Sequence, residues 1–210
     1  MFFKNRIDAG QQIARKLKKY KGQKDTIVVA LPRGGVVNGY EIAKFLNLPL
    51  DIIISKKIGA PGNEEFAIGS VNQDGTAILN DELVKMYNIS PLYIKEETER
   101  VKRKVEEKWK ILKGDARPTD FTNKTVILAD DGIATGYTMK SAIAYLKNKH
   151  ARKIIVAVPV APKEAIEEIK KLANEVICLQ TPFLFGAIGA FYENFKQVED
   201  EEVKKYLSSY

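Results

Sequence analysis

Five short apolar runs, each rich in β-branched residues, constrain the fold of this chain more than any other feature of its sequence. They lie at residues 26–30, 50–54, 125–128, 153–158 and 175–179. Each run is almost continuously apolar, whereas a strand with one solvated face alternates apolar and polar residues. The runs therefore predict strands that are buried on both faces of a parallel sheet.

Amphipathic segments separate these runs. Residues 7–20, the stretch after Gly136 and residues 163–173 place apolar side chains at helical spacing. Alternating strands and helices predict an α/β fold, a three-layer sandwich with a central, mainly parallel sheet. With 210 residues, 45% of them hydrophobic, the chain can bury one sizeable core, so we expect a single main domain over residues 1–210.

Two regions interrupt this alternation. Residues 57–65 have the composition of a loop, and residues 66–75 read as a hairpin that turns at Gln73-Asp74-Gly75. Residues 81–113 are highly charged and predict an inserted helical subdomain, with one apolar face formed by Val101, Val105, Trp109 and Leu112.

The net charge, the cysteine content and the lengths of the apolar runs indicate which partners and which cellular compartment to expect. A formal net charge of +7 indicates an anionic partner, but the lysines are scattered, and no aromatic RNA-binding motif accompanies them. Cys178 is the single cysteine, which excludes a disulfide within the chain. No apolar run has the length of a signal sequence or a membrane span. We expect a cytoplasmic protein with no membrane partner and no nucleic-acid partner.

The most informative stretch is residues 126–138, Val-Ile-Leu-Ala-Asp-Asp-Gly-Ile-Ala-Thr-Gly-Tyr-Thr. An apolar strand ends in two acids, which lead into a loop of small and hydroxyl-bearing residues. Such a loop and the following helix N-terminus can bind a phosphate group, while carboxylates accept hydrogen bonds from sugar hydroxyls. The stretch is neither a Walker loop nor a Gly-x-Gly-x-x-Gly dinucleotide turn. It suits a ribose 5-phosphate.

This stretch resembles the phosphoribosyl pyrophosphate (PRPP) signature of type I phosphoribosyltransferases. The resemblance extends through most of the chain outside residues 81–113 and points to a subgroup with a helical insertion. It implies that Asp130 and Asp131 hold the ribose hydroxyls. It also implies that the 5-phosphate is bound by Gly132, Ile133, Ala134, Thr135, Gly136, Tyr137 and Thr138.

Basic residues after the first two strands resemble the rest of the family's PRPP site. The run Arg33-Gly34-Gly35 resembles the pyrophosphate loop, whose backbone often contains a non-proline cis peptide bond. Its glycines permit close approach of the backbone, and Arg33 is a permanently charged partner for phosphate. Lys56 and Lys57 match the position of a mobile loop that closes over pyrophosphate. The resemblance thus implies Arg33, Lys56, Lys57, Asp130 and Asp131 as catalytic residues.

The implied reaction transfers ribose 5-phosphate from PRPP to a nitrogenous base and releases pyrophosphate, which places the protein in nucleotide or nucleoside metabolism. By resemblance, Mg²⁺ assists and is held largely by PRPP oxygens and water, and Asp130 or Asp131 can reach it through water. A homodimer is also expected from the resemblance.

The sequence leaves the identity of the acceptor base open. Enzymes that act on 6-oxopurines carry an aspartate at the position of Ala134, so this chain lacks that candidate general base. Alanine there resembles the adenine, uracil and orotate branches. We expect residues 180–210 to cap the acceptor site, where Phe183 or Phe185 stacks on a flat base. Core packing is the alternative role for both rings.

Two other classes of function compete with the transferase. A regulatory protein of the same fold could bind PRPP or a nucleotide without transfer. A phosphoryl-transfer enzyme using the acidic pair is less well supported, because no second acidic cluster completes a metal site. The basic residues at Arg33, Lys56 and Lys57 favour the transferase, since a sensor of ribose 5-phosphate alone would not need them.

Overall fold

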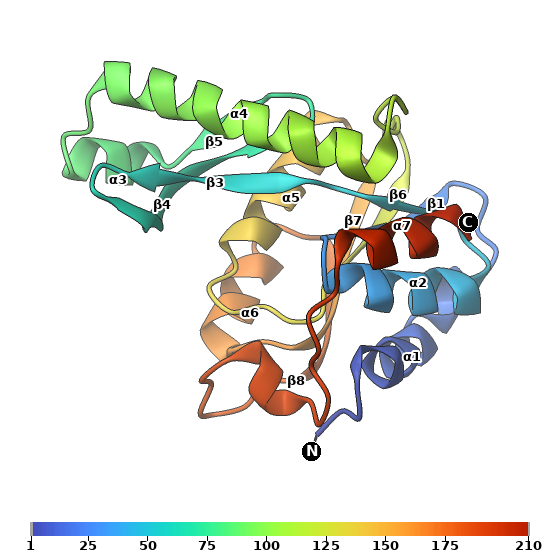
Figure 1. The fold of residues 1–210 in the computed structure, drawn as a ribbon. Coiled ribbons are helices and arrows are strands. Elements are labelled where there is room, and N and C mark those ends of the chain that lie inside the picture. Colours follow the sequence, from blue (N-terminus) through green and yellow to red (C-terminus); the bar gives the residue numbers. More distant parts are fainter. Residues whose placement is uncertain (1, 210) are drawn as a thin grey trace.

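The computed structural model describes residues 2–209, except for the side chain of Glu65. Its centre is a parallel sheet with helices around it (Figure 1). The sheet has five strands in the order β2-β1-β6-β7-β8. Each predicted apolar run forms one of these strands, which confirms the parallel sheet. The strands over residues 26–30, 125–129 and 153–160 are buried as predicted, whereas the edge strand over residues 175–180 is half-buried throughout. The strands are β1 (Thr26–Ala30), β2 (Leu50–Ile52), β6 (Thr125–Ala129), β7 (Lys153–Val160) and β8 (Glu175–Gln180).

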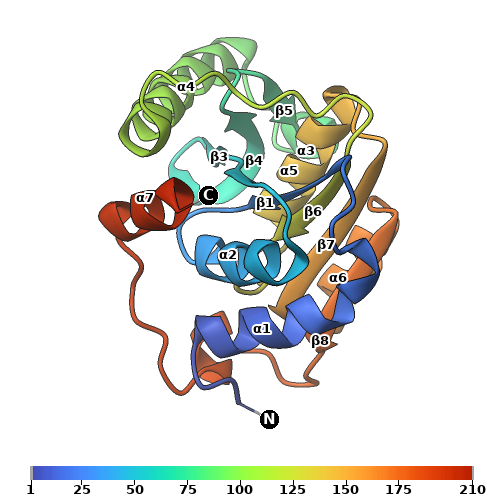
Figure 2. The ribbon, with the colours of Figure 1, turned by 90° about the vertical axis from the view of Figure 1, so that its right-hand side faces the viewer.

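Helices cover both faces of this sheet (Figure 2). On one face, α1 (Arg6–Lys16) and α2 (Gly35–Leu46) pack onto β1, β6 and β7 through a cluster that includes Ile13, Ile42 and Ile127. On the other face lie α5 (Tyr137–Asn148) and α6 (Lys163–Lys170), which bury Ile143 and Ile166. The three-layer α/β architecture is therefore confirmed.

A second, antiparallel sheet stands apart from the first and contains β3 (Ser55–Ala60), β4 (Asn63–Asn72) and β5 (Ala77–Leu79). The prediction of a loop over residues 57–65 is wrong, because most of that segment pairs as strands. Gly59 explains the difference: a Cβ atom there would lie 2.6 Å from the Cα of Glu64, so glycine lets the strands meet where their register shifts. Only Pro61 and Gly62 remain as the turn.

Residues 81–113 are helical, as predicted, and form α3 (Asp81–Met86) and α4 (Pro91–Lys113). The side chains of Val101, Val105 and Leu112 are buried on the antiparallel sheet, and Trp109 packs beside them. Ser90 caps α4 by accepting a hydrogen bond from the N–H of Tyr93. The helix therefore lies across β3 and β4, next to the parallel sheet (Figure 1).

The C-terminal segment contains η2 (Ile188–Phe191) and α7 (Asp200–Ser208). The sequence patterns did not predict α7, which packs between α2 and α4 (Figures 1 and 2). Before it, the segment meets the N-terminus: Phe3 donates its N–H to Phe191 at 2.9 Å, and Glu193 donates to Phe3 at 2.8 Å. Within residues 2–209, no helix is long and apolar enough to cross a membrane.

Candidate functional site

The sheet register places the predicted motifs side by side. Ala30 at the end of β1 pairs with Ala129 at the end of β6 and with Ile52 at the end of β2. The loops that leave these three strands therefore begin at the same edge of the sheet. This is the edge where ligands bind in parallel α/β proteins.

Asp130 and Asp131 pack directly against the run Arg33-Gly34-Gly35, which we call the Arg33 loop. A Cβ atom on Gly34 would lie 1.9 Å from Oδ2 of Asp131, and a Cβ atom on Gly35 would lie 2.7 Å from Oδ1 of Asp130. Any other residue at Gly34 would therefore collide with a carboxylate. The peptide bond between Pro32 and Arg33 is cis, in agreement with the resemblance.

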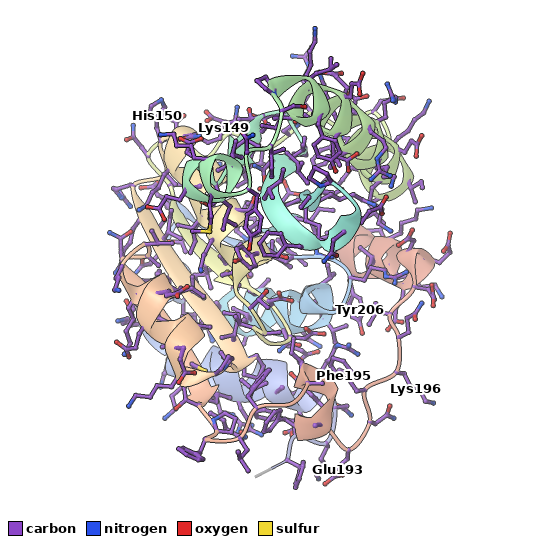
Figure 3. All side chains as sticks on the ribbon, turned by 90° about the vertical axis from the view of Figure 1, so that its left-hand side faces the viewer. Lys149, His150, Glu193, Phe195, Lys196 and Tyr206 are labelled. Carbon is purple, nitrogen blue, oxygen red and sulfur yellow. The ribbon has the colours of Figure 1, made fainter. Side chains whose placement is uncertain are left out.

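Arg6, at the start of α1, binds Asp131. Its Nε donates to Oδ2 of Asp131 at 2.6 Å, its Nη1 donates to the carbonyl of Lys196 at 2.6 Å, and its guanidinium lies 3.7 Å above the centre of the Phe195 ring. Figure 3 shows Phe195 and Lys196 on the segment that leads up to α7. No local sequence pattern points to Arg6, because the contact spans 125 positions.

A tyrosine hydroxyl fixes the backbone of the same acid. Tyr192 donates its hydroxyl to the carbonyl oxygen of Asp131 at 2.5 Å. Burial raises the pKa of Tyr192 above its ordinary value, so the hydroxyl keeps its proton and remains a donor. Asp131 is therefore held at its side chain by Arg6 and at its backbone by Tyr192.

The two carboxyls are desolvated. Burial, followed by the charge of Asp131, raises the pKa of Asp130 well above its ordinary value. Burial also raises the pKa of Asp131, and Arg6 offsets part of that rise. Oδ1 of Asp130 accepts a hydrogen bond from the N–H of Asp131 at 2.8 Å. Ligand hydroxyls that donate to these oxygens would replace lost hydration and favour the charged forms.

The loop after the acids leads into α5. Gly136 has a positive φ of 79° and directly precedes the helix, a conformation that favours glycine. Ile133 is buried and donates its N–H to Val160 at 2.9 Å, so in this structure that N–H is committed to the protein. Thr135, Tyr137 and Thr138 are exposed. The donors open to an anion in the predicted loop therefore lie toward its helical end.

A cavity of about 500 Å³ lies beside these loops. Its charged lining residues are Arg33 from the loop after β1, Lys56 from β3 and Lys108 from α4, and Ser55 and Thr138 contribute hydroxyls. Burial, followed by repulsion from Lys108 and Lys104, lowers the pKa of Lys56. The structure thus brings Arg33, Lys56 and the end of the loop at Thr138 together around one basic cavity.

The comparison with protein-family models supports this arrangement. The model for the phosphoribosyl transferase domain matches residues 3–193. This chain belongs to the phosphoribosyl transferase family. The match includes the acidic pair, the Arg33 loop and the inserted helices.

Relatives of known sequence or structure agree with this assignment. A Mycobacterium tuberculosis protein, present in two strains and named "Putative phosphoribosyl transferase", is 36% identical over 209 residues. The alignment covers 98% of this chain and 46% of the relative, so the chain spans about half the length of the curated relatives it matches. The crystal structure of TT1426 from Thermus thermophilus superposes on this chain with a TM-score of 0.86 and 35% sequence identity. The alignment covers 100% of this chain and 99% of TT1426.

Three other predicted site residues, Lys57, Phe183 and Phe185, lie outside the basic cavity. Lys57 neighbours Lys56 on β3 but is exposed and does not line the cavity. Phe183 is fully exposed, and Phe185 stacks on Phe191 with ring centres 5.4 Å apart. Neither ring lines the cavity, and their acceptor-binding role stays a prediction.

Besides Tyr192, two residues that the sequence did not single out belong to the site geometry. Arg6 holds an acid, and Lys108 contributes a cation to the cavity. Lys108 lies in a run of charged residues on α4, so its position in sequence does not distinguish it from neighbouring lysines. The packing of α4 on β3 determines which of these lysines faces the cavity.

Proposed function

We propose that this chain is a PRPP-dependent phosphoribosyltransferase that transfers ribose 5-phosphate to a nitrogenous base and releases pyrophosphate. The observation that carries the proposal is the packing of two carboxylates against the Arg33 loop beside a basic cavity. Asp130 and Asp131 would bind the ribose hydroxyls, and the loop ending at Thr138 would bind the 5-phosphate. Arg33 and Lys56 would bind the pyrophosphate.

In this reaction the bond between ribose C1 and the pyrophosphate oxygen breaks, and a bond from C1 to a nitrogen of the base forms. The leaving pyrophosphate takes the bonding electrons, and the base nitrogen loses its proton to solvent or to a leaving-group oxygen. Arg33 and Lys56 would neutralise the charge that develops on pyrophosphate. The remaining contribution of the protein is to position the two substrates.

The residues of the site fit a magnesium ion bound chiefly by the substrate. Among the described residues, no group of three or more His, Cys, Asp or Glu side chains is placed to hold a metal ion. Arg6 already occupies Oδ2 of Asp131. PRPP oxygens and water would therefore supply most ligands, with Asp130 in reach through water, and the ion would offset negative charge on pyrophosphate.

One observation favours a second candidate, a protein that binds PRPP or a nucleotide without transfer. The two predicted acceptor rings, Phe183 and Phe185, lie outside the basic cavity, and only a protein that transfers the ribose needs an acceptor site. The two candidates differ in whether bound PRPP is consumed.

The test measures pyrophosphate release from PRPP with magnesium in the presence of purines, pyrimidines and orotate, with mass detection of any phosphoribosylated product. The variant Asp130→Asn/Asp131→Asn should lose PRPP binding and turnover, while Asp25→Asn, at an exposed position, should retain both. Base-dependent release supports the transferase. PRPP binding without turnover against all bases supports the second candidate, and unchanged affinity in the double variant contradicts the role of the acids.

A further inference from the structure

The inserted helix reaches into the basic cavity. Lys108 is the residue of α4 that lines it, and the Lys108 side chain is only 21% exposed. Arg33 comes from the end of β1 and Lys56 from β3, so three elements far apart in sequence each contribute one cation to the same space. This convergence gives residues 81–113 a chemical connection to the site.

The counterions of these cations come from the C-terminal helix and the residue before it. Lys108 pairs with the carboxylate of Asp200, and Nη1 of Arg33 lies 3.6 Å from Oε2 of Glu199. Figure 2 shows α7 next to both α2 and α4, the position that makes these contacts possible. Neither acid lines the cavity, whereas all three cations do.

The cavity wall is therefore positive, and the cations repel one another. Three cations line the space, while the two acids approach them from outside it. Such a site is completed by a ligand that carries several negative charges. Ammonium and guanidinium groups form their strongest hydrogen bonds with oxyanions of this kind.

We propose that Lys108 binds the pyrophosphate group of PRPP, and that Asp200 is a counterion which this group displaces. The inserted helix α4 is then part of the substrate site. Asp200 neutralises Lys108 while the cavity lacks an anion, and it competes with pyrophosphate for the same ammonium group. This inference rests on the proposed function, since it assigns a residue to the same substrate.

The test is calorimetric titration of the full chain with inorganic pyrophosphate and with PRPP, each with and without magnesium. Lys108→Gln is expected to weaken both affinities by about tenfold, the usual contribution of a charge-assisted hydrogen bond. Lys110→Gln is the matched control, because Lys110 is exposed on the same helix and does not line the cavity. Lys108→Arg, which keeps the charge, should restore most of the lost affinity.

Two further readouts separate ligand binding from a structural role. The affinity of Lys108→Gln should fall less steeply with added salt than that of the wild type, because one cation no longer takes part. Asp200→Asn should bind pyrophosphate several-fold more tightly, since the competing carboxylate is gone. Thermal unfolding of each variant establishes that it is folded.

The outcomes distinguish this inference from the proposed function. Wild-type binding that is weakened in Lys108→Gln and unchanged in Lys110→Gln supports the inference. Wild-type binding with equal affinity in Lys108→Gln overturns the inference alone, and weaker binding by Asp200→Asn overturns the role of Asp200. A wild type that binds neither pyrophosphate nor PRPP overturns the proposed function and this inference together.

Discussion

The acidic and the basic parts of the site are built in opposite ways. Asp130 and Asp131 are adjacent in sequence, largely desolvated, and held by Arg6 and Tyr192. Arg33, Lys56 and Lys108 come from separate elements and face a cavity, with their acidic partners partly exposed. The difference indicates that the acidic part is coupled to folding stability, whereas the basic part is available for ligands. Four variants test this contrast.

The largest effect is expected for Arg6→Met, which leaves Asp131 without its cation. The two side chains are 10% and 12% exposed, so the unpaired carboxylate cannot recover its hydration. Loss of one partner of a buried ion pair costs about 3–5 kcal/mol. The free energy of unfolding, measured with urea, should fall by an amount in this range.

Two comparisons give that result its meaning. Arg15→Met, at an exposed position on the same helix, should change the stability little. Adding Asp131→Asn to Arg6→Met should recover part of the loss, because the unpaired charge is removed. A small effect of Arg6→Met would show that the acidic part is not coupled to stability.

A smaller loss is expected for Gly34→Ala, where the new methyl group would overlap Oδ2 of Asp131. The carboxylate would have to move away from Arg6, and overpacking of this kind costs about 1–3 kcal/mol. Gly186→Ala serves as the control, since a Cβ atom there meets no heavy atom within 4 Å. Equal unfolding midpoints for the two variants in a denaturant titration would contradict the close packing of the two motifs.

Asp130→Asn is expected to stabilise the fold at neutral pH, because asparagine carries no charge that has to be buried. Burial and the neighbouring charge raise the pKa of Asp130 in the folded state, so the wild type loses stability as the pH rises through the range between its unfolded and folded pKa values. Asparagine lacks this charge and can still accept the hydrogen bond from the N–H of Asp131.

The pH dependence of that gain provides the check. In acid, where the carboxyl is protonated in both states, wild type and variant should be equally stable. The gain should grow from about pH 4 upward and level off above the folded pKa. Thermal unfolding over this range measures it, and a gain that is constant with pH would show that ionisation of Asp130 is not its cause.

The smallest effect is expected in the basic part. Glu199→Gln removes the acid beside Arg33, but these side chains are 62% and 41% exposed, respectively. Exposed ion pairs contribute about 0–1 kcal/mol, so the unfolding free energy should change by less than about 0.5 kcal/mol. A loss comparable to that of Arg6→Met would remove the distinction between the two parts.

The same contrast explains how much of the site could be predicted from sequence. Residues 126–138 are contiguous, so their strand, acids, loop and helix are visible as a pattern, and the parallel sheet follows from equally local apolar runs. Arg33 and Lys56 could be proposed because each follows a recognisable strand. Family membership was predicted from these motifs and is confirmed by the family model.

The remaining features depend on contacts between distant segments. Arg6 is 125 residues from Asp131, and Lys108 is one of several cations on a charged helix. The strand pairing of residues 57–65 was missed because glycine and proline favour loops locally, whereas Gly59 here serves close strand contact. Helix α7 has few apolar residues and buries only Val203, which leaves little periodic signal.

The hydrogen bond from Tyr192 to Asp131 joins two residues that are made at different times during protein synthesis. The ribosome makes Arg6 first, the two acids later, and Tyr192 and Asp200 after every strand of the parallel sheet. When the central strands have left the ribosome, the nascent chain therefore contains Asp130 and Asp131 but still lacks the Tyr192 hydroxyl that fixes the backbone of Asp131. The nascent protein should thus be able to bind a ligand only after the segment that contains Tyr192 has left the ribosome. By then, every strand of the parallel sheet has been made.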